Sequence, residues 1–271
     1  MKYDLHVHST YSDGIKSVKE LAVEARAAGL AGFALTDHDT IAGWSEIAVV
    51  EETFGITVFP GVELSTEWQK RNVHILGYGI ADEATFREKL VFLSQSRVTR
   101  MEGIVAQLNA LGFAVTMDEI WLKAGDGTVG RPHAAAVLAE KGYVKDRQDA
   151  FDRYLNRGKP AYVERVKYSP WEACALIRSC GGCAVLAHPG LDNAVRVLPQ
   201  LVEAGLSGLE VYHSAHTEIS ASRFAAMALQ YGLFVTAGSD YHGYSDDSHG
   251  YIGSRGLQRE ELPPVFQRYL I

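Results

Sequence analysis

The sequence predicts an α/β protein built as a distorted (β/α)7 barrel, with a small helical subdomain inserted into the barrel. Three observations lead to this prediction. Apolar strand-like segments alternate with amphipathic helical segments in both the first and the last part of the 271-residue chain, a pattern typical of parallel sheets and barrels. The alternation stops over residues 82–163, where helical periodicity replaces it. Histidines and acids follow the predicted strands, and barrel enzymes place their sites at that end.

The first 81 residues contain four predicted strands, at 3–8, 32–36, 57–64 and 73–78. The helix between the first two strands begins with a capping box formed by Ser17 and Glu20, and Gly29 ends it. A second helix is expected over 45–54, before Gly55. We expect the four strands to lie parallel, because helices alternate with buried apolar strands.

The middle of the chain, residues 82–163, is predicted to form the inserted subdomain and to cap a substrate. One long helix is expected over 83–111, and a short helix follows the capping box formed by Thr116 and Glu119. Two more helices are expected over 132–141 and 148–156. The barrel itself then comprises residues 1–81 and 164–271.

The last part of the chain returns to alternation. Ser169 and Glu172 form a capping box, with Pro170 at the first helical position. Strands are expected over 183–187, 208–212 and 234–237, and helices over 194–204 and 219–230. Seven strands favour a barrel, although periodicity alone leaves a doubly wound sheet open.

Composition narrows the class of partner. The net charge is −7, which argues against a broad basic surface for duplex nucleic acid but leaves room for a phosphorylated ligand at a metal site. No run of eighteen apolar residues is present, so we expect no membrane span. The chain begins with strand-like sequence and not with a basic and apolar leader, so a cytoplasmic location is expected. No obligate protein partner is evident.

A histidine pair opens the candidate site. His6 and His8 lie two residues apart on a predicted strand, so their side chains point to the same face. Alone, such a pair is equally consistent with two solvated side chains. Seven further histidines and acids fall at or near strand ends: Asp13, His38, Glu63, His74, His188, Asp240 and His242. Mixed imidazole and carboxylate ligands suit zinc, manganese or iron, and nine ligands match a site for two or three ions.

Cations in the insertion are candidates for binding substrate phosphate. Arg97 and Arg100 lie at i and i+3 on the long predicted helix, and they share one face. For this pair, an ordinary charged helix surface is an equally good interpretation. Arg131 lies where a helix begins, with His133 two residues later, and helix N-termini attract anions. Arg157 and Lys159 are further candidates.

The strand-end residues fall within a set of ordered motifs. These are His6-Val7-His8, Thr36-Asp37-His38-Asp39, Gly61-Val62-Glu63, His74, Ala187-His188-Pro189 and Ser239-Asp240-Tyr241-His242. Together they resemble the motifs of the PHP (polymerase and histidinol phosphatase) family along nearly the whole chain. Gly130-Arg131-Pro132-His133, and the segment 154–163 that carries Arg157 and Lys159, resemble the branch that contains nucleoside 3′,5′-bisphosphate phosphatases and a related 5′-to-3′ exoribonuclease.

The resemblance implies a PHP-type barrel with a trinuclear site, usually of manganese, with iron, zinc or magnesium as alternatives. One ion would be held by His6, His8, Glu63 and Asp240. Glu63 would bridge to a second ion held by His74 and His188, and Asp13, His38 and His242 would hold the third. Glu63, Asp240, His188 and His242 are therefore the expected catalytic residues. Asp37 and Asp39 would orient His38 or shape its loop, because acids beside a ligand commonly support it.

The expected activity is metal-dependent hydrolysis of the 3′-phosphate of nucleoside 3′,5′-bisphosphates, with the 5′ end of short single-stranded RNA as a second substrate. No Ser-His-Asp or G-x-S-x-G signature is present, so no covalent intermediate is expected. A histidinol-phosphate phosphatase is the alternative enzyme, and a metal-binding structural module the non-enzymatic one. His213 is expected to line the pocket, and His216 and His249 to lie at the surface.

Overall fold

The computed structural model describes residues 1–125, 127, 129–164, 168–244 and 249–270. Its centre is an eight-stranded sheet in the order β7-β6-β5-β4-β3-β2-β1-β8. The strands are β1 (Lys2–Val7), β2 (Leu30–Leu35), β3 (Thr57–Trp68), β4 (Arg71–Tyr78), β5 (Cys183–Leu186), β6 (Gly208–His213), β7 (Phe234–Gly238) and β8 (Leu257–Gln258). All seven predicted strands are present, and the two-residue β8 is an addition that is too short to give a sequence signal.

The sheet curls into a nearly closed barrel. The segment after β7 reaches β1 through a bridge between Val7 and Tyr241. Two backbone hydrogen bonds join the same segments: His8 N donates to Tyr241 O and Asp240 N donates to His6 O, each at 2.9 Å. The predicted barrel is therefore confirmed, and its closure brings β1 and the segment after β7 together, so that His6 and His8 lie beside Asp240.

The direction of β4 differs from the prediction. β4 pairs antiparallel with both β3 and β5, while the β1–β2, β2–β3, β5–β6 and β6–β7 pairs are parallel. Only Gln69 and Lys70 separate β3 from β4, and both have positive φ, of 48° and 66°. A two-residue connection forms a hairpin and cannot cross over to a parallel strand. His74 consequently reaches the site from the first half of its strand, opposite Ser65.

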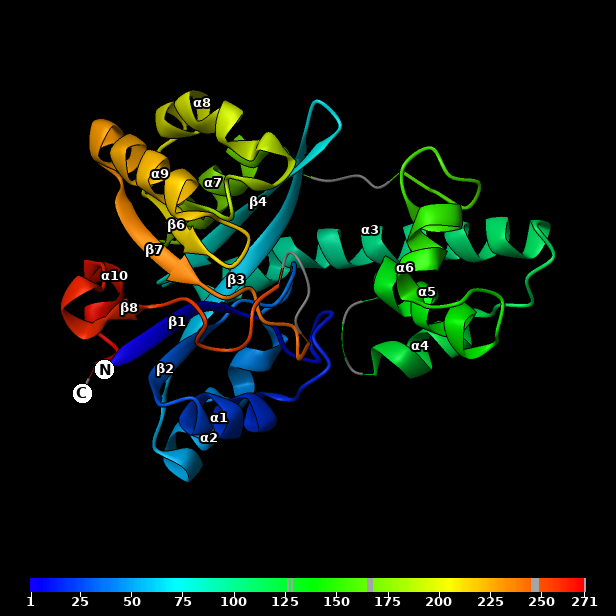
Figure 1. Ribbon diagram of the computed structural model, residues 1–271, viewed down its shortest axis with the longest axis horizontal. Helices are drawn as coiled ribbons and strands as arrows, with labels where there is room; N and C mark the ends of the chain where they lie inside the picture. The colour runs from blue at the N-terminus through cyan, green and yellow to red at the C-terminus, as the bar shows by residue number, and fades with distance from the viewer. Residues whose placement is uncertain (126, 128, 165–167, 245–248, 271) are drawn as a thin grey trace.

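Helices cover the outside of the barrel (Figure 1). They are α1 (Val18–Ala27), α2 (Ile47–Phe54), α7 (Pro170–Ser179), α8 (Leu198–Glu203) and α9 (Glu218–Tyr231), whereas α10 (Pro264–Gln267) lies at one end of the barrel. The capping boxes at Ser17 and Ser169 form as predicted. The helix expected over 194–204 begins later, at Leu198: 3-10 turns occupy Leu191–Val197, with a kink at Asp192 and Asn193, where φ is positive. Short 3-10 segments also occur at Ala42–Glu46 and Arg259–Glu261.

The remaining helices lie beside the barrel. They are α3 (Glu83–Ala110), α4 (Met117–Ala124), α5 (Arg131–Glu140) and α6 (Arg147–Ala150), the last continued by a π-helical turn over Phe151–Leu155. The long α3 extends from the barrel, and α4, α5 and α6 pack along its far half (Figure 1). Buried side chains of these helices, such as Ile104, Ile120 and Leu138, form a hydrophobic cluster of their own.

Aromatic side chains close the end of the barrel opposite the predicted site. The Phe266 ring lies edge-on to the rings of Phe59 and Tyr78, with centroids 5.0 and 4.9 Å away. Edge-to-face ring contacts add to the free energy of apolar burial. Within the described ranges, no helix combines the length and the apolarity that a bilayer crossing requires.

Candidate metal centre

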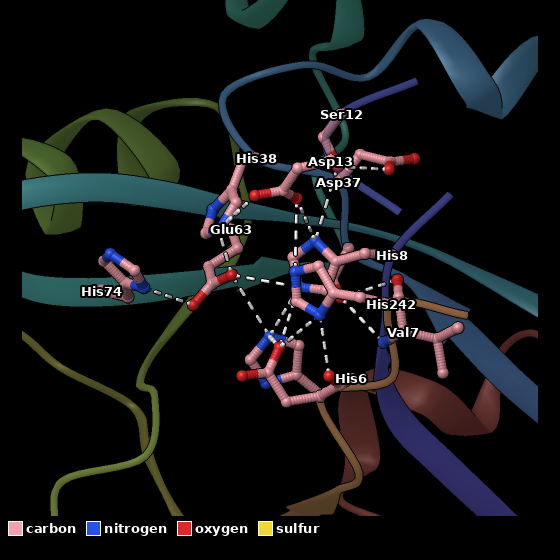
Figure 2. Close-up of polar contacts among 12 residues, drawn as sticks. His6, Val7, His8, Ser12, Asp13, Asp37, His38, Glu63, His74 and His242 are labelled. Atoms are coloured by element: carbon pink, nitrogen blue, oxygen red, sulfur yellow. Dashed lines mark hydrogen bonds and ion pairs between the residues drawn. The ribbon is translucent and has the colours of Figure 1, made fainter. Parts of the chain in front are cut away.

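All nine predicted ligand residues converge at one end of the barrel. Figure 2 labels seven of them: His6, His8, Asp13, His38, Glu63, His74 and His242. His6 lies on β1, Glu63 on β3 and His74 on β4. The other six lie in loops that follow parallel strands: His8, Asp13, His38, His188, Asp240 and His242. Each of the nine has a nitrogen or carboxylate oxygen within 4.0 Å of another member.

Glu63 lies at the centre of this cluster, and its side chain is buried. Its Oε2 atom faces three imidazoles, those of His6, His8 and His38, at 3.2, 3.1 and 3.1 Å. Its Oε1 atom faces the imidazoles of His74 and His188 at 2.9 and 3.0 Å. The two oxygens thus divide the surrounding histidines between them, which is what a carboxylate that bridges two ions would do.

Two aspartates complete the donor set. Asp13 Oδ1 lies 3.2 Å from His242 Nε2, and Asp13 Oδ2 lies 3.8 Å from His38 Nε2. Asp240 Oδ1 lies 3.2 and 3.1 Å from the Nε2 atoms of His6 and His8. Two quartets have their donor atoms mutually within 4.8 Å: His6, His8, Glu63 and Asp240, and His8, Asp13, His38 and His242.

The donor atoms fit divalent metal ions. Asp13 Oδ1, Glu63 Oε2 and Asp240 Oδ1 are buried and have no hydrogen-bond partner among the described residues. Unsatisfied buried oxygens of this kind are costly. The Nε2 atoms of His6 and His8 also lie only 3.1 Å apart. Nitrogens and oxygens that crowd together in this way fit the ligand set of shared cations, and a mixed imidazole–carboxylate set suits manganese, iron or zinc.

The electrostatics of the cluster also favour cations. Burial by itself lowers the pKa of His8, but the adjacent Asp240 and Glu63 carboxylates outweigh burial and raise this pKa to about 10. The pKa of His188 is likewise raised, against burial, chiefly by Glu63. Burial lowers the pKa of His38 to about 3, more than Glu63 and Asp13 raise it. The cluster is therefore a region of negative potential, and it also contains the neutral imidazole of His38, which is in the protonation state that binds a metal ion.

Glu210, in the middle of β6, supports the ligands and was missed in the sequence. Its Oε1 atom lies 3.0 Å from His6 Nδ1, and its Oε2 atom accepts a hydrogen bond of 2.7 Å from His188 N. The first contact orients His6 so that Nε2 faces Glu63 and Asp240, as supporting carboxylates do in metal sites. A lone acid inside an otherwise apolar strand, between Leu209 and Val211, was the available signal.

Asp37 and Asp39, the acids on either side of His38, form contacts outside the cluster of predicted ligands. Asp37 accepts hydrogen bonds from Ser9 N at 2.8 Å and from Ser12 Oγ at 2.7 Å, which shapes the loop after β1. Asp39 accepts from Ser65 N at 2.8 Å and forms an ion pair with Arg97. Neither acid belongs to the groups of converging donor atoms found among the described residues.

Three further histidines lie near the cluster. His213 is buried, with Nε2 3.5 Å from Asp240 Oδ2. The prediction that His216 lies at the surface is wrong. His216 is buried, and its Nδ1 lies 2.8 Å from Val211 O. His249 is partly buried, with Nε2 3.9 Å from Asp240 Oδ2.

A cavity of about 170 Å³ joins the metal cluster to the insertion. Asp13, His38 and His74 line one side, and Arg97, Arg100 and Arg131 line the other. Arg97 donates to Asp39 and to Ser65 Oγ, the latter at 3.0 Å, so its guanidinium is largely occupied by the barrel. Arg100 Nε donates to Val163 O at 2.7 Å.

Arg97 pairs with Asp39 and Arg157 with Glu67, whereas no carboxylate of the described residues lies within ion-pair distance of Arg131. Its Nη1 donates to Leu155 O at 3.3 Å. Burial lowers its pKa, Tyr162 raises it, and the positive charges of Arg97 and Arg157 lower it further. A carbonyl oxygen carries no full charge, so the cavity is lined by a cation that lacks a counter-ion.

His133 also lies at this junction, in the first turn of α5. Gly130 N donates a hydrogen bond of 3.1 Å to His133 Nδ1. Burial lowers the pKa of His133, and Arg97 and Arg147 lower it against the opposing effect of Asp13. With Nδ1 accepting, the neutral ring carries its proton on Nε2, which is therefore a donor.

Comparison with known proteins identifies the class of protein to which this chain belongs. The PHP domain model matches residues 4–150. The chain is 35% identical to a 3′,5′-nucleoside bisphosphate phosphatase of Chromobacterium violaceum over 97% of this chain and 93% of that one. It is 34% identical to a 5′-3′ exoribonuclease of Haemophilus influenzae, over 89% and 90% of the two chains.

A solved structure agrees with these relatives. A protein of Bifidobacterium adolescentis assigned as a metal-dependent phosphoesterase superposes with a TM-score of 0.88 and 28% identity, covering 98% of this chain and 96% of that one. A barrel with this fold and this cluster of histidines and carboxylates defines a metal-dependent phosphoesterase. More particularly, the chain belongs to the PHP family.

Proposed function

We propose that this protein removes the 3′-phosphate from nucleoside 3′,5′-bisphosphates. The observation that carries the proposal is the position of Arg131, a cation without a counter-ion that lines the same cavity as Asp13, His38 and His74. A substrate with two phosphates places one at the metal cluster and has another available for this guanidinium. The similarity to the Chromobacterium violaceum phosphatase supports the same substrate class.

The nine converging residues would hold two or three Mn²⁺ ions, with Fe²⁺, Zn²⁺ or Mg²⁺ to be distinguished by elemental analysis. Bound divalent ions supply an activated water and neutralise charge on phosphoryl oxygens. Glu63 would join two ion positions through its two oxygens, with His188 beside Oε1. Asp240 and His242 would each serve a different position. Glu210 holds His6 in the ligating orientation.

The insertion would supply the groups that bind the second phosphate. Arginine forks bind phosphate bidentately, and Arg131 and Arg100 both line the cavity. His133 lines the adjoining cavity, where it would donate to substrate from Nε2, since Gly130 N occupies Nδ1. Arg97 is better assigned a positioning role, because Asp39 and Ser65 occupy its donors. A histidinol-phosphate phosphatase is disfavoured, because one phosphate needs fewer cations than line this cavity.

The 5′ end of short single-stranded RNA is a second candidate substrate, and the shape of the site favours it. A further cavity of about 480 Å³ shares Asp13 and Pro132 with the first and continues past Asp13. The rest of an RNA strand, attached through the reacting ester, would have room in this cavity. Its lining residues include Lys123, His133 and Arg147. The Haemophilus influenzae relative is an exoribonuclease.

Replacing Arg131 by Ala tests the proposal. The kcat/KM of the variant for adenosine 3′,5′-bisphosphate should fall by an amount equivalent to about 2–4 kcal/mol of transition-state stabilisation. The value is taken by analogy with breaking a buried charge pair. Hydrolysis of p-nitrophenyl phosphate should change little, because that substrate has no second phosphate. Arg153→Ala is the matched control, since Arg153 is an exposed arginine of the same insertion. An equal loss on both substrates would assign Arg131 to the reacting phosphate or to folding.

A further inference from the structure

A second cationic cavity continues from the metal-side cavity, on the far side of Arg131. Its volume is about 340 Å³, and it shares Asn72, Arg100 and Arg131 with the first. The described residues that line it include none of the nine predicted metal ligands. Its other lining residues are Lys70, Arg71, Asn156, Arg157, Tyr162 and Asp192. This distal cavity therefore adjoins the first at Asn72, Arg100 and Arg131, and it lies away from the predicted metal ligands.

The charge of the distal cavity is mainly positive. Asp192 is the one acid among its described lining residues. Arg157 is balanced by Glu67 at 2.7 Å and Glu164 at 3.1 Å. In contrast, the described part of the chain places no carboxylate within ion-pair distance of Lys70 or Arg71. A polyanion that entered the cavity would meet these cations without displacing an existing ion pair.

A contact to Asp192 holds Arg71 in place, and Lys70 is exposed beside it. Lys70 lies in the two-residue turn between β3 and β4, and Arg71 follows it. Arg71 Nη1 donates to Asp192 O at 3.2 Å, and the neighbouring Asn72 Nδ2 donates to Asp192 Oδ2 at 3.1 Å. These contacts join the hairpin tip to the turn before α8. The Arg71 side of the cavity is thus in place before a ligand arrives, which lowers the entropic cost of binding there.

We propose that the distal cavity binds the outer phosphoryl group of a 5′-diphosphate, so that the enzyme accepts 3′-phosphorylated nucleoside 5′-diphosphates. This inference rests on the proposed function, which places the 3′-phosphate at the metals and the 5′-phosphate at Arg131. The next group along the substrate then lies beyond Arg131, where Lys70 and Arg71 line the wall. A nucleoside bisphosphate is too short to use these cations, whereas a 5′-diphosphate extends toward them.

Product-like ligands give a direct test. Titration calorimetry should measure the binding of adenosine 5′-monophosphate and adenosine 5′-diphosphate at fixed free manganese, and again after chelation of metal. The diphosphate should bind about tenfold more tightly to the wild type, a typical value for one added charge-assisted contact. The double variant Lys70→Gln/Arg71→Gln should lose that advantage while binding the monophosphate normally.

Two further variants make the test specific. Lys145→Gln/Arg153→Gln removes the same charge from exposed positions of the insertion outside the distal cavity, and it should keep the tenfold preference. Asp192→Asn removes the acid from the cavity and retains an oxygen for Asn72, so it should strengthen diphosphate binding. A gain of this kind cannot come from misfolding.

The possible outcomes separate this inference from the proposed function. Failure to hydrolyse adenosine 3′,5′-bisphosphate would overturn the proposed function, whatever the calorimetry shows. Equal affinity of the wild type for the two ligands would overturn the inference alone. An equal loss of both ligands in Lys70→Gln/Arg71→Gln would also overturn it, because the distal cavity would then hold the 5′-phosphate itself.

Discussion

The ion pair between Arg97 and Asp39 connects the insertion to the barrel, and its removal should be strongly destabilising. The Asp39 side chain is 0% exposed and that of Arg97 is 12% exposed. Arg97 donates to Asp39 Oδ2 from Nε at 2.9 Å and also from Nη2. Arg97→Ala would leave a buried carboxylate without its cation, and breaking such a pair costs about 3–5 kcal/mol. We expect that loss in the free energy of unfolding.

Urea denaturation followed by tryptophan fluorescence and circular dichroism measures this loss. The matched control is Arg87→Ala on the same helix, because Arg87 pairs with Glu83 at the surface, where the side chains are 50% and 52% exposed. That variant should lose less than about 0.5 kcal/mol. A loss below about 1 kcal/mol in Arg97→Ala would refute the argument that the buried pair joins the two parts.

Kinetics of the same variants separate positioning from substrate binding. Arg97 Nη2 also donates to Ser65 Oγ, which lies 3.4 Å from His38 Nδ1. If Arg97 positions the loop of His38, Arg97→Ala should lower kcat by a similar factor for p-nitrophenyl phosphate and for a nucleoside bisphosphate. A loss confined to the bisphosphate would return Arg97 to direct phosphate binding, as the sequence suggested.

Three further predictions concern the metal centre. Glu63→Gln should abolish turnover while the circular dichroism spectrum stays native, because an amide is a poor bridging ligand; near-normal kcat at saturating manganese would contradict the bridging role. The metal-loaded protein should contain two or three ions per chain by elemental analysis. Manganese binding at pH 7 should release protons, because the pKa of His8 is raised to about 10 before metal binds and a ligating imidazole must be neutral. Affinity should therefore rise with pH, and calorimetry in buffers of different ionisation enthalpy would detect the released protons; equal heats in those buffers would contradict this.

Sequence patterns that extend over only a few residues determined the helix starts, the strands and the candidate metal site of this protein. The capping boxes at Ser17 and Ser169 predicted helix starts, because a cap and its partner lie only three residues apart. Strands recognised from short apolar runs predicted the barrel. The histidines and acids at their ends predicted a metal site, because parallel strands bring their carboxyl ends together.

The tertiary structure decided what depends on partners far along the chain. Hydrophobic periodicity does not indicate the direction of a strand. The hairpin at Gln69 and Lys70 reverses β4, and this reversal decides the direction from which His74 reaches Glu63. The support of His6 by Glu210 spans 204 positions. The pairing of Arg97 with Asp39 spans 58. A charge in the sequence has no partner until folding places one beside it, and that partner decides whether an arginine binds substrate or holds the fold together.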